Sequence, residues 1–305
     1  MDRELVASLA IIIAGVLIAG YVTATSLNQY SVQSKGKGLL VVVTFPSLVS
    51  DVKQLLCPQD RVISLVPPGV DPHTYTLSLE DIEEAKRADI VISTGHAPFE
   101  IRLRDHINNE KLVEIPRMPG IKIEDIIGTS SPNLHMPIYD PHNYIVFVNY
   151  VAKRLAELRP ACSLHYLAMA RKVSNKVAEM TESSPRLNIQ GVGSTPLVQY
   201  AVSWLGIRLK ALMMTSPEAG ITGQQFEKVK ELLASRRAEI AIIVSTSPGK
   251  CTPMSKADEK TLALAKQYKV PVLCVPSPLV QEPIPDKLEA IIVQVKGLYS
   301  ILSAR

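Results

Sequence analysis

Clustered positive charge is missing from this 305-residue sequence. Lysine and arginine total 33 against 29 acidic residues, which leaves a formal net charge of +4, and the basic residues are spread along the chain. Binding to a nucleic-acid backbone requires grouped cations that neutralise phosphates. The sequence therefore predicts that nucleic acid is not a partner.

The motifs of several common enzyme classes are also missing. The chain contains no G-x-S-x-G, no P-loop and no G-x-G-x-x-G. The segment GVGST at 191–195 has amides that suit an anion, but an ordinary strand-to-helix turn explains it better. A metallohydrolase needs a general base beside an open metal position, and nothing in the spacing of Asp71 or Glu100 singles either out. We expect that the protein is not an enzyme.

Cysteine is scarce, and its four copies are far apart. Cys57, Cys162, Cys251 and Cys274 include no pair at the short spacing of zinc ribbons or redox motifs. We expect isolated, partly buried thiols. A Cys251–Cys274 disulfide is the alternative outside the cytoplasm, but spacing alone does not establish it.

Charge is absent between Leu5 and Ser26, and this segment is about as long as the ~20 apolar residues that cross a bilayer. A cleaved secretory signal has a shorter apolar core of ~7–15 residues behind a positive start. We therefore expect residues 1–34 to be an uncleaved N-terminal membrane anchor with a spacer, and the globular part to be extracytoplasmic. Tyr21 stands where a lipid-bearing cysteine would follow LIAG, which excludes lipidation there.

Short β-branched runs alternate with helical periodicity in both halves of the chain, on either side of an all-helical middle. Strand, helix, strand at short intervals predicts parallel sheets wrapped by helices. The segment from Asp140 to Ser183 has helical spacing throughout, with a break at Pro160. We predict an α/β fold with two lobes, each a mostly parallel sheet flanked by helices, at 38–158 and 185–305, joined by a long linking helix at 159–184.

One histidine follows a predicted strand in the segment VPPGVDPHTY. Ligands of open α/β sheets bind at the carboxyl ends of strands, and His73 lies just beyond the strand predicted at 61–66. Pro72 fixes its own φ and pushes Asp71 toward an extended conformation, so the turn holds His73 with little backbone freedom. We predict that His73 is a ligand-binding residue.

A second group of polar residues forms NLHMPIYDPHN at 133–143. Asp140 and Pro141 fit an N-cap and a first-turn proline, which explains both without a ligand. His135 has no such explanation, and imidazole in a loop before a helix suits zinc or a similar divalent ion. His142, in the first helical turn, is expected to face solvent.

Two long segments carry a family resemblance. SLVPPGVDPHTYTLSLEDIEEAKRADIVISTG followed by Glu100 resembles the N-terminal lobe of the periplasmic zinc- and manganese-binding proteins of ABC importers, and NLHMPIYDPHN resembles their second histidine motif. The similarity covers most of residues 38–305. It implies a two-lobed solute-binding protein that carries Zn2+ or Mn2+ between its lobes to an ABC permease, with His73 and His135 as ligands and Glu100 as a structural residue.

This sequence departs from the family pattern in its C-terminal half. Thr195 occupies the place of the family's third histidine, and Pro276 and Ser277 stand where its last acidic ligand would follow the final strand. Two imidazoles alone would bind zinc weakly, and His96 in STGHAPFE is the candidate for a third ligand. The alternative function is a membrane-tethered interaction or sensory protein that keeps the fold but has lost tight metal binding.

Overall fold

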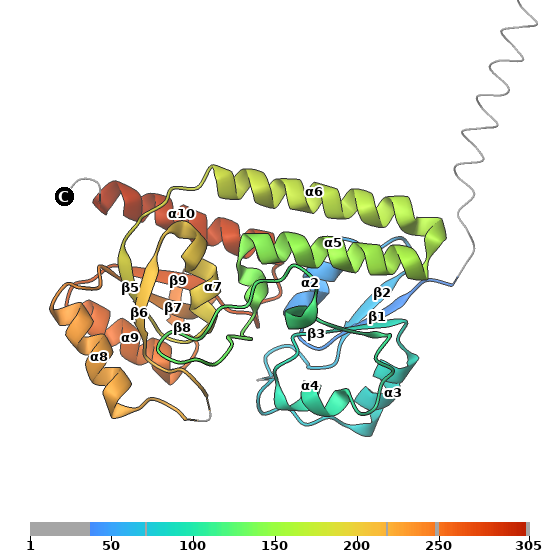
Figure 1. The fold of residues 1–305 in the computed structure, drawn as a ribbon, viewed down its shortest axis with the longest axis horizontal. Helices are drawn as coiled ribbons and strands as arrows, with labels where there is room; N and C mark the ends of the chain where they lie inside the picture. Colours follow the sequence, from blue (N-terminus) through green and yellow to red (C-terminus); the bar gives the residue numbers. More distant parts are fainter. Residues whose placement is uncertain (1–36, 71, 218, 248–249, 303–305) are drawn as a thin grey trace, which may run out of the picture. The chain divides into compact units, whose positions relative to one another are not determined.

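Two β-sheets, one in each half of the chain, organise the fold (Figure 1). The computed structural model describes residues 37–302 except 71, 218 and 248–249. The anchor and spacer predicted at 1–34 lie outside the described residues. Among the helices within these ranges, none combines the length and the apolar character that crossing a membrane requires.

The first sheet has four parallel strands in the order β2-β1-β3-β4. Its central strand β1 is a continuous apolar run that is buried almost throughout, as expected for a parallel sheet covered on both faces. Ser78 and Asp81 form the capping box that starts α3. The elements are β1 (Leu40–Val43), α2 (Ser47–Lys53), β2 (Arg61–Ser64), α3 (Leu79–Arg87), β3 (Ile90–Ser93), α4 (Pro98–Leu103), β4 (Leu112–Glu114) and the 3-10 turn η1 (Ile115–Arg117).

A helical segment connects the two sheets. Asp140 caps the first long helix through a hydrogen bond from the Asn143 amide, 3.0 Å long, with Pro141 in the first turn. Pro160 ends that helix, and α5 and α6 then lie side by side (Figure 1). The elements are η2 (Pro137–Tyr139), α5 (Pro141–Leu158), η3 (Pro160–Cys162) and α6 (Ser163–Glu182).

The second sheet runs β6-β5-β7-β8, with β9 also paired to β7. All pairings are parallel except β7 with β8. Gly193 in β5 permits close packing, because a Cβ there would lie 2.7 Å from the Val198 side chain. The elements are β5 (Gln190–Gly193), α7 (Leu197–Val202), η4 (Ser203–Leu205), β6 (Arg208–Leu212), α8 (Gly223–Ala234), β7 (Ile240–Ser247), β8 (Lys250–Pro253), α9 (Lys256–Gln267), β9 (Val272–Pro276) and α10 (Ile284–Leu302).

One hydrophobic core joins the two sheets. It contains buried residues of β1, β3, α5, α7, β7 and α10, while two smaller clusters lie beneath α3 and beneath α8 and α9. The predicted α/β fold and its helical connection are confirmed. Sequence patterns missed the short elements α4, β4 and β8, the last of which forms a hairpin with β7. The lobe boundaries at 38–158, 159–184 and 185–305 stay a prediction.

The expectation of isolated thiols is wrong. Cys251 and Cys274 form a disulfide with a Cα–Cα distance of 5.5 Å, which was the open alternative. Cys57 and Cys162 form a second disulfide, 6.4 Å between Cα atoms, and no cysteine is free in the part of the chain that the structure describes. The sequence separation of 105 hid this pair from spacing arguments, because only the packing of the α5–α6 turn beside β1 and β2 brings the two cysteines together.

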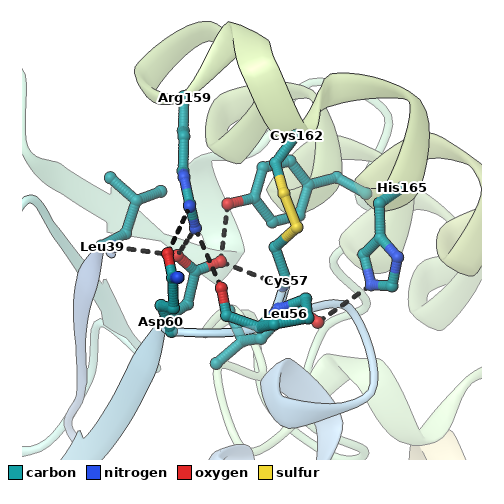
Figure 2. Close-up of a disulfide and its surroundings, with 10 residues drawn as sticks. Leu39, Leu56, Cys57, Asp60, Arg159, Cys162 and His165 are labelled. Atoms are coloured by element: carbon teal, nitrogen blue, oxygen red, sulfur yellow. Dashed lines mark hydrogen bonds and ion pairs between the residues drawn. A yellow bond between two sulfur atoms is a disulfide. The ribbon is translucent and has the colours of Figure 1, made fainter. Parts of the chain in front are cut away.

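The buried carboxylate of Asp60 stabilises the region around the Cys57–Cys162 disulfide (Figure 2). Asp60 accepts hydrogen bonds from the amides of Leu39 and Cys57, both 2.9 Å long. It also forms a 2.7 Å ion pair with Arg159, which precedes η3. The start of the first strand and the turn between the long helices are thereby fixed to the same loop (Figure 2).

Candidate metal centre

Three histidines converge at the carboxyl edge of the first sheet. His73 follows β2, His96 follows β3, and His135 comes from the long loop that leads to η2. Their ring centroids lie 5.4 Å apart for His73 and His96, 6.1 Å for His73 and His135, and 5.0 Å for His96 and His135. Each ring offers one nitrogen, and these atoms all lie within 4.8 Å of one another. The three residues singled out by the sequence therefore meet at one place.

The histidines form one wall of a cavity of about 260 Å³. The opposite wall comes from the carboxyl edge of the second sheet and includes Thr195, Met214, Val244 and Leu279. Both sheets thus present their strand ends to the same space, which is where parallel α/β sheets bind ligands. Thr195 lies at the cavity as the family pattern predicts, whereas Ser277 is fully buried and is not among its lining residues.

A short loop after β3 holds His96. Gly95 adopts a left-handed conformation with φ of 76°, which residues with a side chain rarely adopt. Glu100, in the first turn of α4, is buried and accepts hydrogen bonds from the amides of His96 and Ala97, both 2.9 Å long. The carboxylate therefore ties the loop to the helix that follows it. This supports the structural role expected for Glu100.

The hydrogen bonds around His96 fix which ring nitrogen carries the proton. The Thr94 hydroxyl donates its only hydrogen to Glu100 Oε2 over 2.7 Å. The same hydroxyl lies 3.0 Å from His96 Nδ1, so at that contact it accepts, and Nδ1 carries the hydrogen. Nε2 of the neutral ring is then left with the lone pair that a metal requires. Such a second hydrogen bond orients most metal-binding histidines.

Asn133 acts on His135 in the same way. Its amide nitrogen donates to the Pro196 carbonyl over 2.9 Å, so its oxygen is the atom that faces the histidine. That oxygen accepts from the His135 backbone amide at 3.1 Å and lies 3.2 Å from Nδ1. Nδ1 is therefore the donor, and Nε2 of the neutral His135 ring keeps its lone pair. Sequence patterns missed both Asn133 and Thr94, although each lies two residues before its histidine.

His73 is held by its turn and by the other two rings. Pro72 before it is buried, and the His73 ring stacks on His135 with an interplanar angle of 20°. Asp71, considered above as a general base, lies outside the described residues. His142 is exposed on α5 as expected, and His165 lies elsewhere, 2.9 Å from the Leu56 carbonyl oxygen (Figure 2).

The arrangement has the composition of a three-ligand metal site. Zinc binds imidazole nitrogen at ~2.0–2.1 Å, so neighbouring ligand atoms of a tetrahedral site lie roughly 3.3 Å apart. The ring nitrogens here lie within 4.8 Å, and a contraction of about 1.5 Å brings them to that spacing. All three rings are partly buried, which limits competition from water. The residues therefore fit a transition-metal ion with one further coordination position.

Comparison with known proteins identifies the family of the chain. Residues 41–278 match the family ZnuA, described as zinc-uptake complex component A, periplasmic. This segment is more than half of the chain, and the chain belongs to that family. The fold is that of the solute-binding protein FpvC from Pseudomonas aeruginosa, solved in complex with Mn2+, with a TM-score of 0.68, 18% identity and coverage of 86% of this chain and 100% of that one.

Curated relatives share between a fifth and a third of their aligned residues with this chain. The metal ABC transporter substrate-binding lipoprotein ScbA of Streptococcus cristatus is 27% identical over 159 residues, 48% of this chain and 50% of its own length. The chain thus matches about half the length of this relative. The zinc-binding protein TroA of Treponema pallidum is 22% identical over 78% of this chain and 81% of its own length.

Proposed function

We propose that this chain is the extracytoplasmic solute-binding protein of an ABC importer and that it carries a transition-metal ion in the cavity between its two sheets. His73, His96 and His135 are the ligands in this proposal. The observation that carries it is their convergence, with the Nδ1 atoms of His96 and His135 engaged by Thr94 and Asn133. An interaction module without a metal has no need of three imidazoles oriented in this way.

Of zinc and manganese, zinc is the ion that the donors favour. Imidazole suits zinc, whereas manganese prefers carboxylate, carbonyl and water oxygens. Glu100 is close to the site, but three donors contact each of its oxygens, so it is not a ligand in this proposal. Protonated imidazole does not bind metal, so we expect affinity to fall as the solution is acidified.

The two disulfides support an extracytoplasmic location, because disulfides persist in oxidising compartments. We infer that the uncharged segment from Leu5 to Ser26 anchors the chain in the membrane and that the permease of the importer is its protein partner. The relatives are substrate-binding transport proteins by name. We accordingly propose no catalytic activity for this chain.

Calorimetry with Zn2+ and Mn2+ on the full chain tests the proposal. We expect sub-micromolar zinc binding with one ion per chain. Each of His73→Ala, His96→Ala and His135→Ala removes one of the three imidazoles, and structural zinc sites gain about 3 kcal/mol per ligand. Zinc affinity should therefore fall about 100-fold in each variant.

His142→Ala is the matched control, because His142 belongs to the same sequence motif as His135 but is exposed on α5. Its zinc affinity should equal that of the wild type. Absence of zinc and manganese binding by the wild-type chain would reject these two ions as cargo, and a chain that binds no transition-metal ion at all would leave the tethered interaction or sensory protein as the function. Equal binding by His96→Ala and the wild type would remove His96 from the ligand set.

A further inference from the structure

Methionine is unusually concentrated at the cavity. Of the eight methionines in the sequence, Met136, Met214 and Met254 line the same cavity as the three histidines. They come from three separate places, namely the loop before η2, the segment after β6 and the segment after β8. Thioethers are soft, polarisable sulfur donors as well as apolar side chains. The wall of the cavity thus includes thioether as well as imidazole side chains.

Met136 is held in a conformation that its sequence alone would not favour. Its φ is 51°, in the left-handed region that residues with a side chain occupy infrequently. The residue is 2% exposed and directly follows His135. A backbone of this kind places consecutive side chains on one cavity, and such outliers persist where the surrounding structure holds them.

Met254 is oriented by a buried hydroxyl. Ser277 is fully buried and its Oγ donates to the Met254 sulfur over 3.0 Å. Ser277 is itself fixed, since its amide donates to the Ser245 carbonyl over 2.8 Å and its Oγ accepts from the Leu279 amide over 3.0 Å. Ser277 stands near the place of the family's acidic ligand. In this chain the Ser277 hydroxyl donates a hydrogen bond to the Met254 sulfur.

Asp258 is the carboxylate among the described residues that line the cavity, and both of its oxygens already accept hydrogen bonds. Asp258 accepts from the Val244 amide over 2.7 Å through Oδ1, and from the Ser255 amide over 2.9 Å and hydroxyl over 2.6 Å through Oδ2. It is 1% exposed and forms the capping box of α9. Besides this carboxylate, the described residues that line the cavity include the three imidazoles, the three thioethers and the hydroxyl side chains of Thr195 and Ser255.

From these observations we infer that the cavity binds Cu(I), with the three imidazoles and a thioether from the methionine wall as ligands. The inference rests on the proposed metal-binding function and names a softer cargo for the same site. Thioether donors favour Cu(I), imidazole suits copper as well as zinc, and Mn2+ prefers oxygen donors. Zinc uses the imidazoles and does not need the sulfur. Methionine loss therefore separates the two ions.

The test measures Cu(I) affinity of the full chain under argon with ascorbate, by competition with bicinchoninate, and zinc affinity by competition with a chromogenic zinc chelator. Met136→Leu, Met214→Leu, Met254→Leu and the triple variant keep the apolar volume and remove the sulfur. Met169→Leu, on α6 and away from the cavity, is the control. X-ray absorption of the Cu(I)-loaded chain reports sulfur in the metal shell directly.

We expect wild-type Cu(I) affinity at least about 100-fold above Mn2+ affinity. The triple variant should lose at least about 10-fold in Cu(I) affinity and less than about 3-fold in zinc affinity, and the sulfur shell should disappear. Unchanged Cu(I) affinity in the triple variant, or a wild-type shell of nitrogen alone, overturns this inference while zinc binding keeps the proposed function. Failure of the wild type to bind zinc, Cu(I) or Mn2+ overturns the proposed function itself.

Discussion

Two buried carboxylates show how differently the same fold treats a negative charge. Glu100, beside the histidines, is 2% exposed, and three donors contact each of its oxygens; Thr44 and Ser93 add to those described above. Asp51, on α2, is 1% exposed, and its Oδ1 accepts from the Tyr144 hydroxyl and the Ile284 amide. Asp51 Oδ2 has no hydrogen-bond partner within the described part of the chain.

The difference appears in their acidity. Burial opposes ionisation of Glu100, but nearby His96 and the hydrogen bonds from Thr44, Thr94 and Ala97 hold the pKa of this carboxyl below its ordinary value. Burial raises the pKa of Asp51 from 3.8 to about 6, although Lys287 and the Tyr144 hydroxyl lower it. Burial also lowers the pKa of Lys287 to about 8. Hydrogen-bond donors, rather than the extent of burial, therefore decide whether a buried carboxylate stays charged.

The largest expected effect comes from removing the buried charge of Lys287, which interacts electrostatically with Asp51. Lys287, on α10, is 1% exposed, and its Nζ lies 6.0 Å from the centre of the Tyr139 ring. Lys287→Met removes the charge that compensates Asp51, and loss of one partner of a buried pair costs about 3–5 kcal/mol. Urea unfolding at pH 7.5 should show this loss of unfolding free energy.

The double variant with Asp51→Asn should recover most of the stability, because a buried pair replaced by neutral groups is often no less stable. Lys296→Met, on the exposed face of the same helix, is the control and should leave stability unchanged. A single Lys287→Met variant as stable as the wild type would show that the two charges do not interact.

The second effect is the pH dependence of stability, in which the two carboxylates act in opposite directions. The pKa of Asp51 is raised on folding, so between about pH 4 and 6 the native chain holds more protons and stability falls as pH rises. A pKa difference of about 2 corresponds to about 3 kcal/mol. Glu100 has a lowered pKa, so its contribution is present above its unfolded pKa of 4.5 and is lost on acidification.

Unfolding free energies measured from pH 4 to 7 for the wild type and Asp51→Asn test this sign. The difference between the two chains should grow in favour of the variant as pH rises through 6. A difference that stays constant across this interval would mean that Asp51 has an ordinary acidity in the folded chain.

The smallest effect concerns Thr94, which connects Glu100 to the proposed metal ligand His96. Thr94→Val keeps the side-chain shape but removes the hydroxyl that accepts from His96 Nδ1. Loss of such an orienting hydrogen bond lowers metal affinity about 10-fold. Zinc calorimetry should give this loss, with Thr129→Val in the exposed turn after Ile126 as the control; equal affinities would limit the Glu100 network to a structural role.

The sequence was sufficient to predict those features of the fold and the site that depend on neighbouring residues in the chain. β-branched runs, caps and prolines located most strands and helices, and the loop positions of His73, His96 and His135 at strand or helix ends indicated the site. Asp51 and Lys287 are separated by more than two hundred residues, and no sequence pattern near either residue predicts that the two interact. The same holds for the Cys57–Cys162 disulfide, which depends on how α6 packs. Contacts between residues that are distant in the sequence could not be predicted, because no local sequence pattern indicates them.

The Cys57–Cys162 bond restricts where the molecule can bend. It attaches the turn before α6 covalently to the loop between α2 and β2, and the Arg159–Asp60 ion pair reinforces that attachment. The N-terminal end of α6 must therefore move together with the first sheet as one rigid unit. We therefore expect an opening of the cavity to bend the chain beyond the far end of this helix, in the short stretch from Ser183 to the start of β5.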